Sequence, residues 1–219
     1  MFWKKKRKVE TRACFWTTDQ GCSDGFMADA KACFEQHRHV LVIGHFSTTS
    51  ERVSQQLASA GLCSTLLSAV EELAPHRLEW LCRGGSAAII PYALLERAAP
   101  FAPSKPDPLV QAAILVSEMY PTSDREALVE AFAAGLPFDV SLTLYASLQS
   151  PLMRMFGSEK IVALMHRLGM DENSRMEHPF LADSLRAAQR RIKGRVQQEM
   201  PAASQREWFE RNLPDGGRP

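Results

Sequence analysis

The chain has 219 residues, of which 45% are hydrophobic and 23% are charged, and its formal net charge is +1. This balance is typical of a soluble globular protein, and a chain of this length can bury an ample core without disulfides or metals. No apolar run is long enough to cross a bilayer, and the basic start is followed by polar residues rather than by the apolar segment of a signal peptide. The sequence therefore predicts a cytoplasmic protein.

The first 23 residues are predicted to form a polar, irregular lead-in. Within them stands a basic block made of Lys4, Lys5, Lys6, Arg7 and Lys8. Such a block can make weak contact with an anionic membrane or with nucleic acid, and it also fits a lysine-rich nuclear-import signal. The plainer interpretation is a solvated, disordered start whose like charges keep apart.

Strands and helices are predicted to alternate from residue 26 onward. Residues 26–36 fit a short helix, and the unbroken apolar run at 39–44 fits a central strand of a parallel sheet. Residues 48–51 read Thr-Thr-Ser-Glu, a capping box that predicts a helix ending near Gly61. Residues 63–68 could be a second strand.

The second half of this region repeats the alternation. Residues 87–90 and 112–116 are predicted strands, separated by a proline-rich loop at 98–108. Another capping box, Ser-Asp-Arg-Glu, predicts a helix over 123–134, and residues 140–145 form the last predicted strand. Strands alternating with helices predict an α/β fold, a parallel sheet with helices on both faces.

Only helices are predicted after residue 150. Two short apolar segments are followed by an apolar stripe of residues spaced three or four apart, at Leu181, Leu185, Ala188, Ile192 and Val196. Because such a stripe is unfavourable in water, we expect it to dock on another part of the protein. The domain organisation is then a lead-in at 1–23, an α/β domain at 24–150, a C-terminal helical extension at 151–200 and a flexible tail at 201–219.

The sequence contains an odd number of cysteines, Cys14, Cys22, Cys33, Cys63 and Cys82. We expect reduced thiols that are mostly buried. A zinc site can be imagined from Cys14, Cys22, Cys33, His37 and His39, but their spacing does not match the short paired patterns of structural zinc sites. We therefore predict neither a metal nor a cofactor.

A stretch of about fifty residues resembles one family in detail. Residues 147–157 read SLQSPLMRMFG, followed by LGM at 168–170, EHP at 177–179 and AAQRRIKGR at 187–195. These phrases are similar to those of SecA, the ATPase that drives proteins through the bacterial export channel, where its second nucleotide-binding domain passes into a helical region. The resemblance implies a RecA-like parallel sheet followed by a helical extension.

The motifs that this family uses for ATP are not found in the sequence. In an ungapped register, the family phrase Q-L-R-G-R-x-G-R falls on residues 128–135, where Phe132 and Gly135 stand in place of two arginines. The glycine-rich A-G-R-G-T-D phrase and a P-loop are also missing from the sequence. Phosphoryl transfer needs positive charge against the γ-phosphate, so we predict that the chain is not an ATPase.

The resemblance leads to the hypothesis of a non-catalytic adaptor or regulator linked to protein export. Its partner would be a protein such as SecA or the translocase, whereas a small molecule is not expected. The candidate contact residues are the N-terminal basic block and the basic flank of the last long helix, Arg186, Arg190, Arg191, Lys193 and Arg195. Two alternatives stay open: an enzyme with an unrelated site near His45 or Gly84-Gly85, and a nucleic-acid-binding, helicase-like relic.

Overall fold

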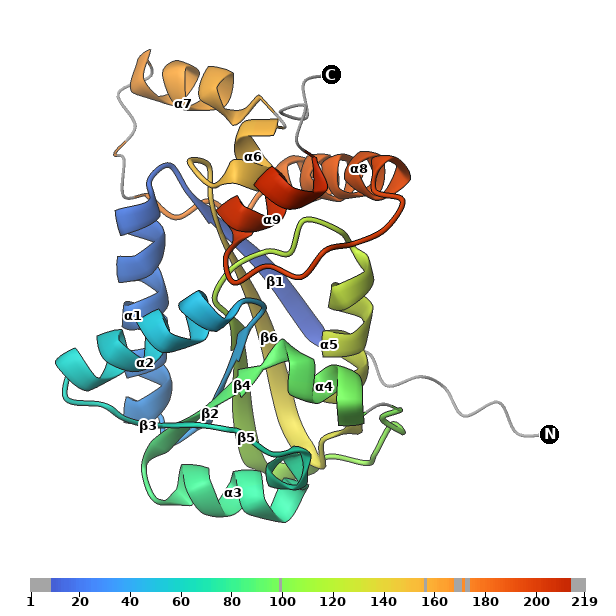
Figure 1. Cartoon of the computed structure of the whole chain (residues 1–219). Coiled ribbons are helices and arrows are strands. Elements are labelled where there is room, and N and C mark those ends of the chain that lie inside the picture. Colours follow the sequence, from blue (N-terminus) through green and yellow to red (C-terminus); the bar gives the residue numbers. More distant parts are fainter. Residues whose placement is uncertain (1–8, 99, 156, 168–170, 172–173, 214–219) are drawn as a thin grey trace.

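The computed structural model describes residues 9–98, 100–155, 157–167, 171 and 174–213 (Figure 1). Six strands of this part of the chain form one parallel sheet in the order β1-β6-β5-β2-β4-β3. The strands are β1 (Glu10–Trp16), β2 (His39–Gly44), β3 (Cys63–Leu66), β4 (Ser86–Pro91), β5 (Asp107–Val116) and β6 (Phe138–Ser147).

Helices connect these strands and continue after the last of them. They are α1 (Asp19–Glu35), α2 (Ser47–Ser59), the 3-10 turn η1 (Val70–Leu73), α3 (Pro75–Arg83), α4 (Tyr92–Ala98), α5 (Asp124–Gly135), α6 (Pro151–Met155), α7 (Ser158–Arg167), α8 (Pro179–Arg195) and α9 (Gln205–Asn212). Every strand to strand crossover within the sheet carries at least one helix, as parallel pairing requires.

The central strands are buried on both faces, which explains their unbroken apolar sequences. In β2, Val40 and Val42 join the core under α1 and α2, whereas Leu41 and Ile43 join the core under α3, α4 and α5. Alternate residues of one strand point to opposite faces, so both cores depend on the same strand. The predicted fold class, an α/β fold with a parallel sheet covered on both faces and followed by helices, is confirmed.

The apolar stripe of α8 docks as expected. Leu181, Leu185 and Ile192 belong to the same buried cluster as the strands and the helices α3 to α5. The extension and the sheet therefore share one continuous core, and the ribbon shows the C-terminal helices beside one end of the sheet (Figure 1). None of the described helices combines the length and the apolar character needed to cross a membrane.

The predicted irregular lead-in is wrong for residues 10–23. Glu10–Trp16 forms β1, which pairs along its whole length with β6, and α1 already begins at Asp19. The first three residues of β1 are exposed and the last three are buried. An edge strand with a solvated first half lacks the apolar run of a central strand, so its sequence resembles that of a loop.

The predicted flexible tail is wrong for residues 205–212, which form α9. Its Trp208 is fully buried and belongs to the main core. The start of the helix is capped by side chains, because the N-cap Ser204 hydroxyl accepts from the Glu207 amide at 3.2 Å, and the Glu207 carboxylate accepts from the amide of the preceding residue, Ala203, at 2.7 Å. This Ser-x-x-Glu pattern is the signal in the sequence from which the helix could be predicted.

Both helices predicted from capping boxes within the α/β domain exist, but neither is capped in that way. α2 begins at Ser47 after Phe46, and α5 begins after Ser123 without a side-chain cap. The Thr48 hydroxyl instead donates to the Ala203 carbonyl at 2.6 Å, and Glu126 accepts from Gln189 of α8 at 2.7 Å. These polar side chains therefore hold the C-terminal part of the chain rather than the ends of their own helices.

Candidate functional site

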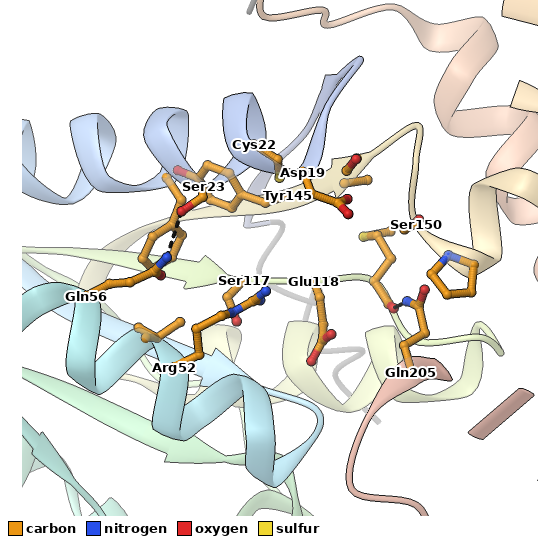
Figure 2. Close-up of a pocket in the computed structure, with 16 residues that line it drawn as sticks. Asp19, Cys22, Ser23, Arg52, Gln56, Ser117, Glu118, Tyr145, Ser150 and Gln205 are labelled. Atoms are coloured by element: carbon orange, nitrogen blue, oxygen red, sulfur yellow. Dashed lines mark hydrogen bonds between the residues drawn. The ribbon is translucent and has the colours of Figure 1, made fainter. Parts of the chain in front are cut away.

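A cavity of about 170 Å³ lies at the carboxyl edge of the sheet, between α1 and α2 (Figure 2). Ligands of parallel α/β proteins bind at this edge, outside the ends of the strands. The cavity is lined by Asp19, Cys22, Ser23 and Phe26 from α1, Arg52, Val53 and Gln56 from α2, Ser117, Glu118 and Met119 after β5, Tyr145, Ala146 and Ser147 of β6, and Ser150, Pro151 and Gln205 from the extension. The fold thus brings together residues from five separate stretches of the sequence.

Glu118 is the most perturbed carboxyl group of the cavity wall. Burial raises its pKa to about 7, against the lowering effects of a hydrogen bond from the Thr49 hydroxyl, the charge of Arg52 and the backbone amide of Phe46. Its Oε1 atom is buried and has no hydrogen-bond partner in the described part of the chain. Glu118 is therefore largely protonated below pH 7 and ionised above it, and it joins the start of α2 to the end of β5.

Arg52 is the basic group of the cavity. It extends from α2 into the space between Gln56 and Glu118 (Figure 2). Within the described residues its guanidinium makes neither an ion pair nor a hydrogen bond, although it is near enough to lower the pKa of Glu118. The cavity therefore has a cation whose donors are not used by the protein.

A second and more open hollow of about 470 Å³ adjoins the first, between α6 and α9. The two share Asp19 and Pro151. The hollow has an apolar floor with Met155, Phe209 and Leu213, and its rim carries Arg154, Arg206, Asp19 and Glu210. Because the rim charges balance, this hollow has no preference for a charged ligand.

The end of α5, where the resemblance to SecA places arginines, is closed. Phe132 is fully buried and packs edge-to-face on Phe101 with ring centroids 5.1 Å apart. A Cβ atom at Gly135 would lie 3.1 Å from Phe101 Cβ and 3.3 Å from the Ala102 carbonyl oxygen, both tighter than ordinary contacts. The Ser104 amide also donates to the Ala134 carbonyl at 3.1 Å. The proline-rich loop therefore covers the turn after α5.

His45 lies in a different place from the cavity. It is buried between the rings of Tyr92 and Tyr120, with centroids 5.1 Å and 5.4 Å away. Burial lowers its pKa to about 3, with the charge of Arg125 acting in the same direction. His45 is therefore a neutral side chain of an aromatic cluster and does not line either hollow. Gly84 and Gly85 form the turn between α3 and β4, where Gly85 has a φ of +75° that favours glycine.

The basic flank of α8 is exposed on the side opposite the apolar stripe. All five of its residues are exposed; Arg186 forms an ion pair with Asp183 at 3.1 Å, and Lys193 forms one with Asp124 at 2.6 Å. Arg190 and Arg191 form none among the described residues. The structure does not bring this flank into the cavity. The basic block Lys4, Lys5, Lys6, Arg7 and Lys8 lies outside the described residues.

The five cysteines are free thiols, and all of them except Cys63 are buried. In the described part of the chain, no three His, Cys, Asp or Glu side chains are grouped closely enough to hold a metal ion. Burial raises the pKa of the Cys22 thiol to about 12, so this cysteine of the cavity wall stays protonated and is a poor nucleophile.

The architecture defines an α/β domain with a parallel sheet and a helical extension, and sequence comparison finds similarity to a protein translocase subunit. The chain is similar to the protein translocase subunit SecA of Anaeromyxobacter sp. (strain Fw109-5), with 46% identity over 54 residues, or 25% of this chain and 6% of that protein. SecA of Chromobacterium violaceum is 26% identical over 212 residues, covering 78% of this chain and 23% of SecA. The chain thus spans less than a quarter of the length of these relatives.

The chain matches no family model. Among solved structures, the C-terminal part of the Fun30 ATPase domain matches with a TM-score of 0.43 and 13% identity, covering 81% of this chain and 56% of that one. The relation to SecA therefore rests on sequence, and it extends over most of the chain at low identity and over a quarter of it at high identity.

Sequence reasoning missed the cavity and its two main residues. The segment ending in Glu118 resembles a strand of SecA, but the resemblance gives no role to its carboxyl group. Arg52 belongs to no motif at all. Their positions in the sequence are the signal that could have found them. Glu118 follows the buried strand β5, and Arg52 lies one turn into α2, the helix that follows strand β2.

Proposed function

We propose that the chain is a non-catalytic, SecA-like protein-binding module that acts as an adaptor or regulator linked to protein export. The observation that carries this proposal is the closed end of α5. Phe132 points into the core, and Gly135 is pressed against Phe101 and Ala102, where the resemblance would require two arginines facing a triphosphate. A site of this kind offers no positive charge to a transferring phosphoryl group.

The basic flank of α8 supports the protein-binding part of the proposal. The apolar side of α8 is buried, so its geometry is fixed, and the opposite side presents five cations to solvent. Arg190 and Arg191 have no ion pair within the described residues, so a partner can use them without breaking internal contacts. An acidic surface of SecA or of another translocase component fits this flank by charge complementarity.

The catalytic part is tested with the purified chain, magnesium and ATP. We expect no heat of ATP binding in calorimetry and no phosphate release above a blank without protein. Turnover that scales with protein concentration through chromatographic purification would refute the proposal.

The binding part is tested by titrating the chain onto immobilised SecA at several salt concentrations. We expect binding that weakens with salt and that is lost in the double variant Arg190→Glu, Arg191→Glu. The matched control is Lys31→Glu, Arg77→Glu, which reverses two exposed charges on α1 and α3 and should bind as the wild type does. Equal binding by both double variants, or no binding by the wild type, would contradict the role of the flank.

A further inference from the structure

The cavity between α1 and α2 takes no part in the proposed function. It lies beside the ends of β5 and β6 on the side of the sheet that carries α1 and α2, whereas α5 packs on the opposite side. The basic flank of α8 does not line it either. Its residues are therefore available for a separate role, and their chemistry is well suited to one class of ligand.

Three serine hydroxyls of the cavity wall already accept a hydrogen bond. Ser23 accepts from the Gln56 side chain at 2.7 Å, Ser147 accepts from the Gln149 amide at 3.0 Å, and Ser150 accepts from the Met153 amide at 3.4 Å. In the described part of the chain, none of the three hydroxyls donates in return. Since a hydroxyl has one proton to donate, each can offer it to a molecule in the cavity.

Arg52 adds charge to these donors. Its guanidinium carries five N–H groups in a planar fork that matches a carboxylate or a phosphate. In the described structure none of these groups meets an internal acceptor, and the side chain extends into the cavity wall beside Ser117 (Figure 2). An unpaired guanidinium together with three unused hydroxyl protons gives the cavity hydrogen-bond donors for an oxyanion, beside the carboxyl groups of Asp19 and Glu118 that line the same wall.

The remaining walls limit what the rest of the ligand can be. Phe26, Val53 and the ring of Tyr145 give the cavity an apolar side, and Tyr145 is fixed by stacking on Trp16 at 5.6 Å between ring centroids. Asp19 provides an acceptor at the mouth. With a volume of about 170 Å³, the cavity holds several water molecules or one small organic molecule.

We propose that this cavity binds a small organic oxyanion, a phosphate or carboxylate that also carries a hydroxyl group, with Arg52 holding the oxyanion, and with the serine hydroxyls and Asp19 forming hydrogen bonds along the rest of the molecule. This ligand would bind in addition to the protein partner proposed above, and it departs from the expectation that a small molecule is not involved. The two proposals stand on different residues, so either can fail alone.

The experiment measures the thermal stability of the full chain with four probes at equal ionic strength. The probes are glycerol 3-phosphate, D-glycerate, inorganic phosphate and glycerol. A ligand that binds only the folded protein raises its melting temperature with concentration. We expect glycerol 3-phosphate or D-glycerate to raise the melting temperature, and the probe that does so shows whether the site prefers a phosphate or a carboxylate. Inorganic phosphate should act more weakly because it lacks the carbon-bound hydroxyl, and glycerol should have no effect.

Variants assign the effect to the cavity. Arg52→Met keeps the length of the side chain and removes its charge, and it should weaken binding of the active probe at least tenfold in calorimetry. Ser147→Ala should weaken it less. The matched control Lys31→Met removes an exposed cation of α1 that does not line the cavity, and it should leave binding unchanged. Absence of any shift in the wild type, an equal shift with glycerol, or unchanged binding in Arg52→Met would each overturn the proposal.

Discussion

Replacing Glu118 by Gln should change how the stability of the protein depends on pH. The carboxyl group has an ordinary pKa of 4.5, and in the folded protein burial raises the pKa to about 7. Between these values the folded state holds a proton that the unfolded state has released. The free energy of unfolding therefore decreases as pH rises from 4.5 to 7, and the Glu118→Gln variant cannot show this loss because an amide does not titrate.

The size of the effect follows from proton linkage. A difference of about 2.5 units between folded and unfolded pKa corresponds to a limit of roughly 3.4 kcal/mol, of which roughly 2.5 kcal/mol falls between pH 5 and pH 8. The nearby thiol of Cys22, with a pKa of about 12, stays protonated throughout this range. All other groups are shared by the two proteins, so their contributions cancel in the comparison.

Urea denaturation of the wild type and of Glu118→Gln at pH 5, 6, 7 and 8 measures this difference. We expect the variant to gain about 2.5 kcal/mol relative to the wild type across the series. Glu35→Gln, at an exposed carboxylate of α1, is the matched control and should show no such trend. A wild-type minus variant difference that stays constant within about 0.5 kcal/mol, or that changes in the opposite direction, would refute the buried state of Glu118.

Three further predictions concern the packing around the sheet. Trp208→Ala should lower the free energy of unfolding in urea by about 3–5 kcal/mol, because the side chain is fully buried; a loss below about 1 kcal/mol would show that α9 does not pack as described. Arg175→Met should cost about 1–2 kcal/mol through its ion pairs with Asp29 at 3.0 Å and Glu177 at 2.7 Å, and a double-mutant cycle with Asp29→Asn should show coupling. The pKa of His45 is lowered from 6.5 to about 3, so on acidification the unfolded state takes up a proton before the folded state does, and the wild type loses stability. Between pH 7 and pH 4.5 the free energy of unfolding of His45→Gln should fall by about 2.5 kcal/mol less than that of the wild type. Equal losses in both proteins would contradict this.

The central sheet was predictable because its strands are buried on both faces. Residues 39–44, 87–90 and 112–116 are apolar with hardly a break, and the structure places all three runs in neighbouring strands, β2, β4 and β5. A stretch of this kind has few alternatives to a parallel sheet. The apolar stripe of α8 was also predictable from local sequence, because apolar residues spaced three or four apart fall on one face only when the segment is helical.

The edges of the fold were not predictable in the same way. β1 begins with Glu10, Thr11 and Arg12, which face solvent, and its outer side is covered by an isolated bridge from Met176 to Phe15 with two backbone hydrogen bonds of 2.9 Å. That bridge joins residues 161 positions apart in the sequence. No local pattern contains a contact of this range, so the lead-in could not be recognised as part of the sheet.

The candidate cavity was also beyond local patterns. Its hydrogen-bond donors come from α1, α2 and the end of β6, and none of Ser23, Arg52 and Ser147 belongs to a motif that binds anions. Their proximity follows from the order of the strands, which places β6 beside β5 and β5 beside β2. A sequence can indicate that ligands bind at the carboxyl edge of a parallel sheet, but the choice of side chains there depends on the complete topology.

The C-terminal segment explains why the cavity lies under α1 and α2 rather than at the point where the strand order reverses, between β2 and β5. The Thr48 amide and hydroxyl both donate to the Ala203 carbonyl, and the Gln205 side chain donates to the Met119 carbonyl at 2.7 Å. Glu199 also accepts from Tyr120, so residues 199–205 occupy the crevice itself. The chain thus fills the usual ligand position with its own backbone, and the cavity lined by Arg52 stays open beside it.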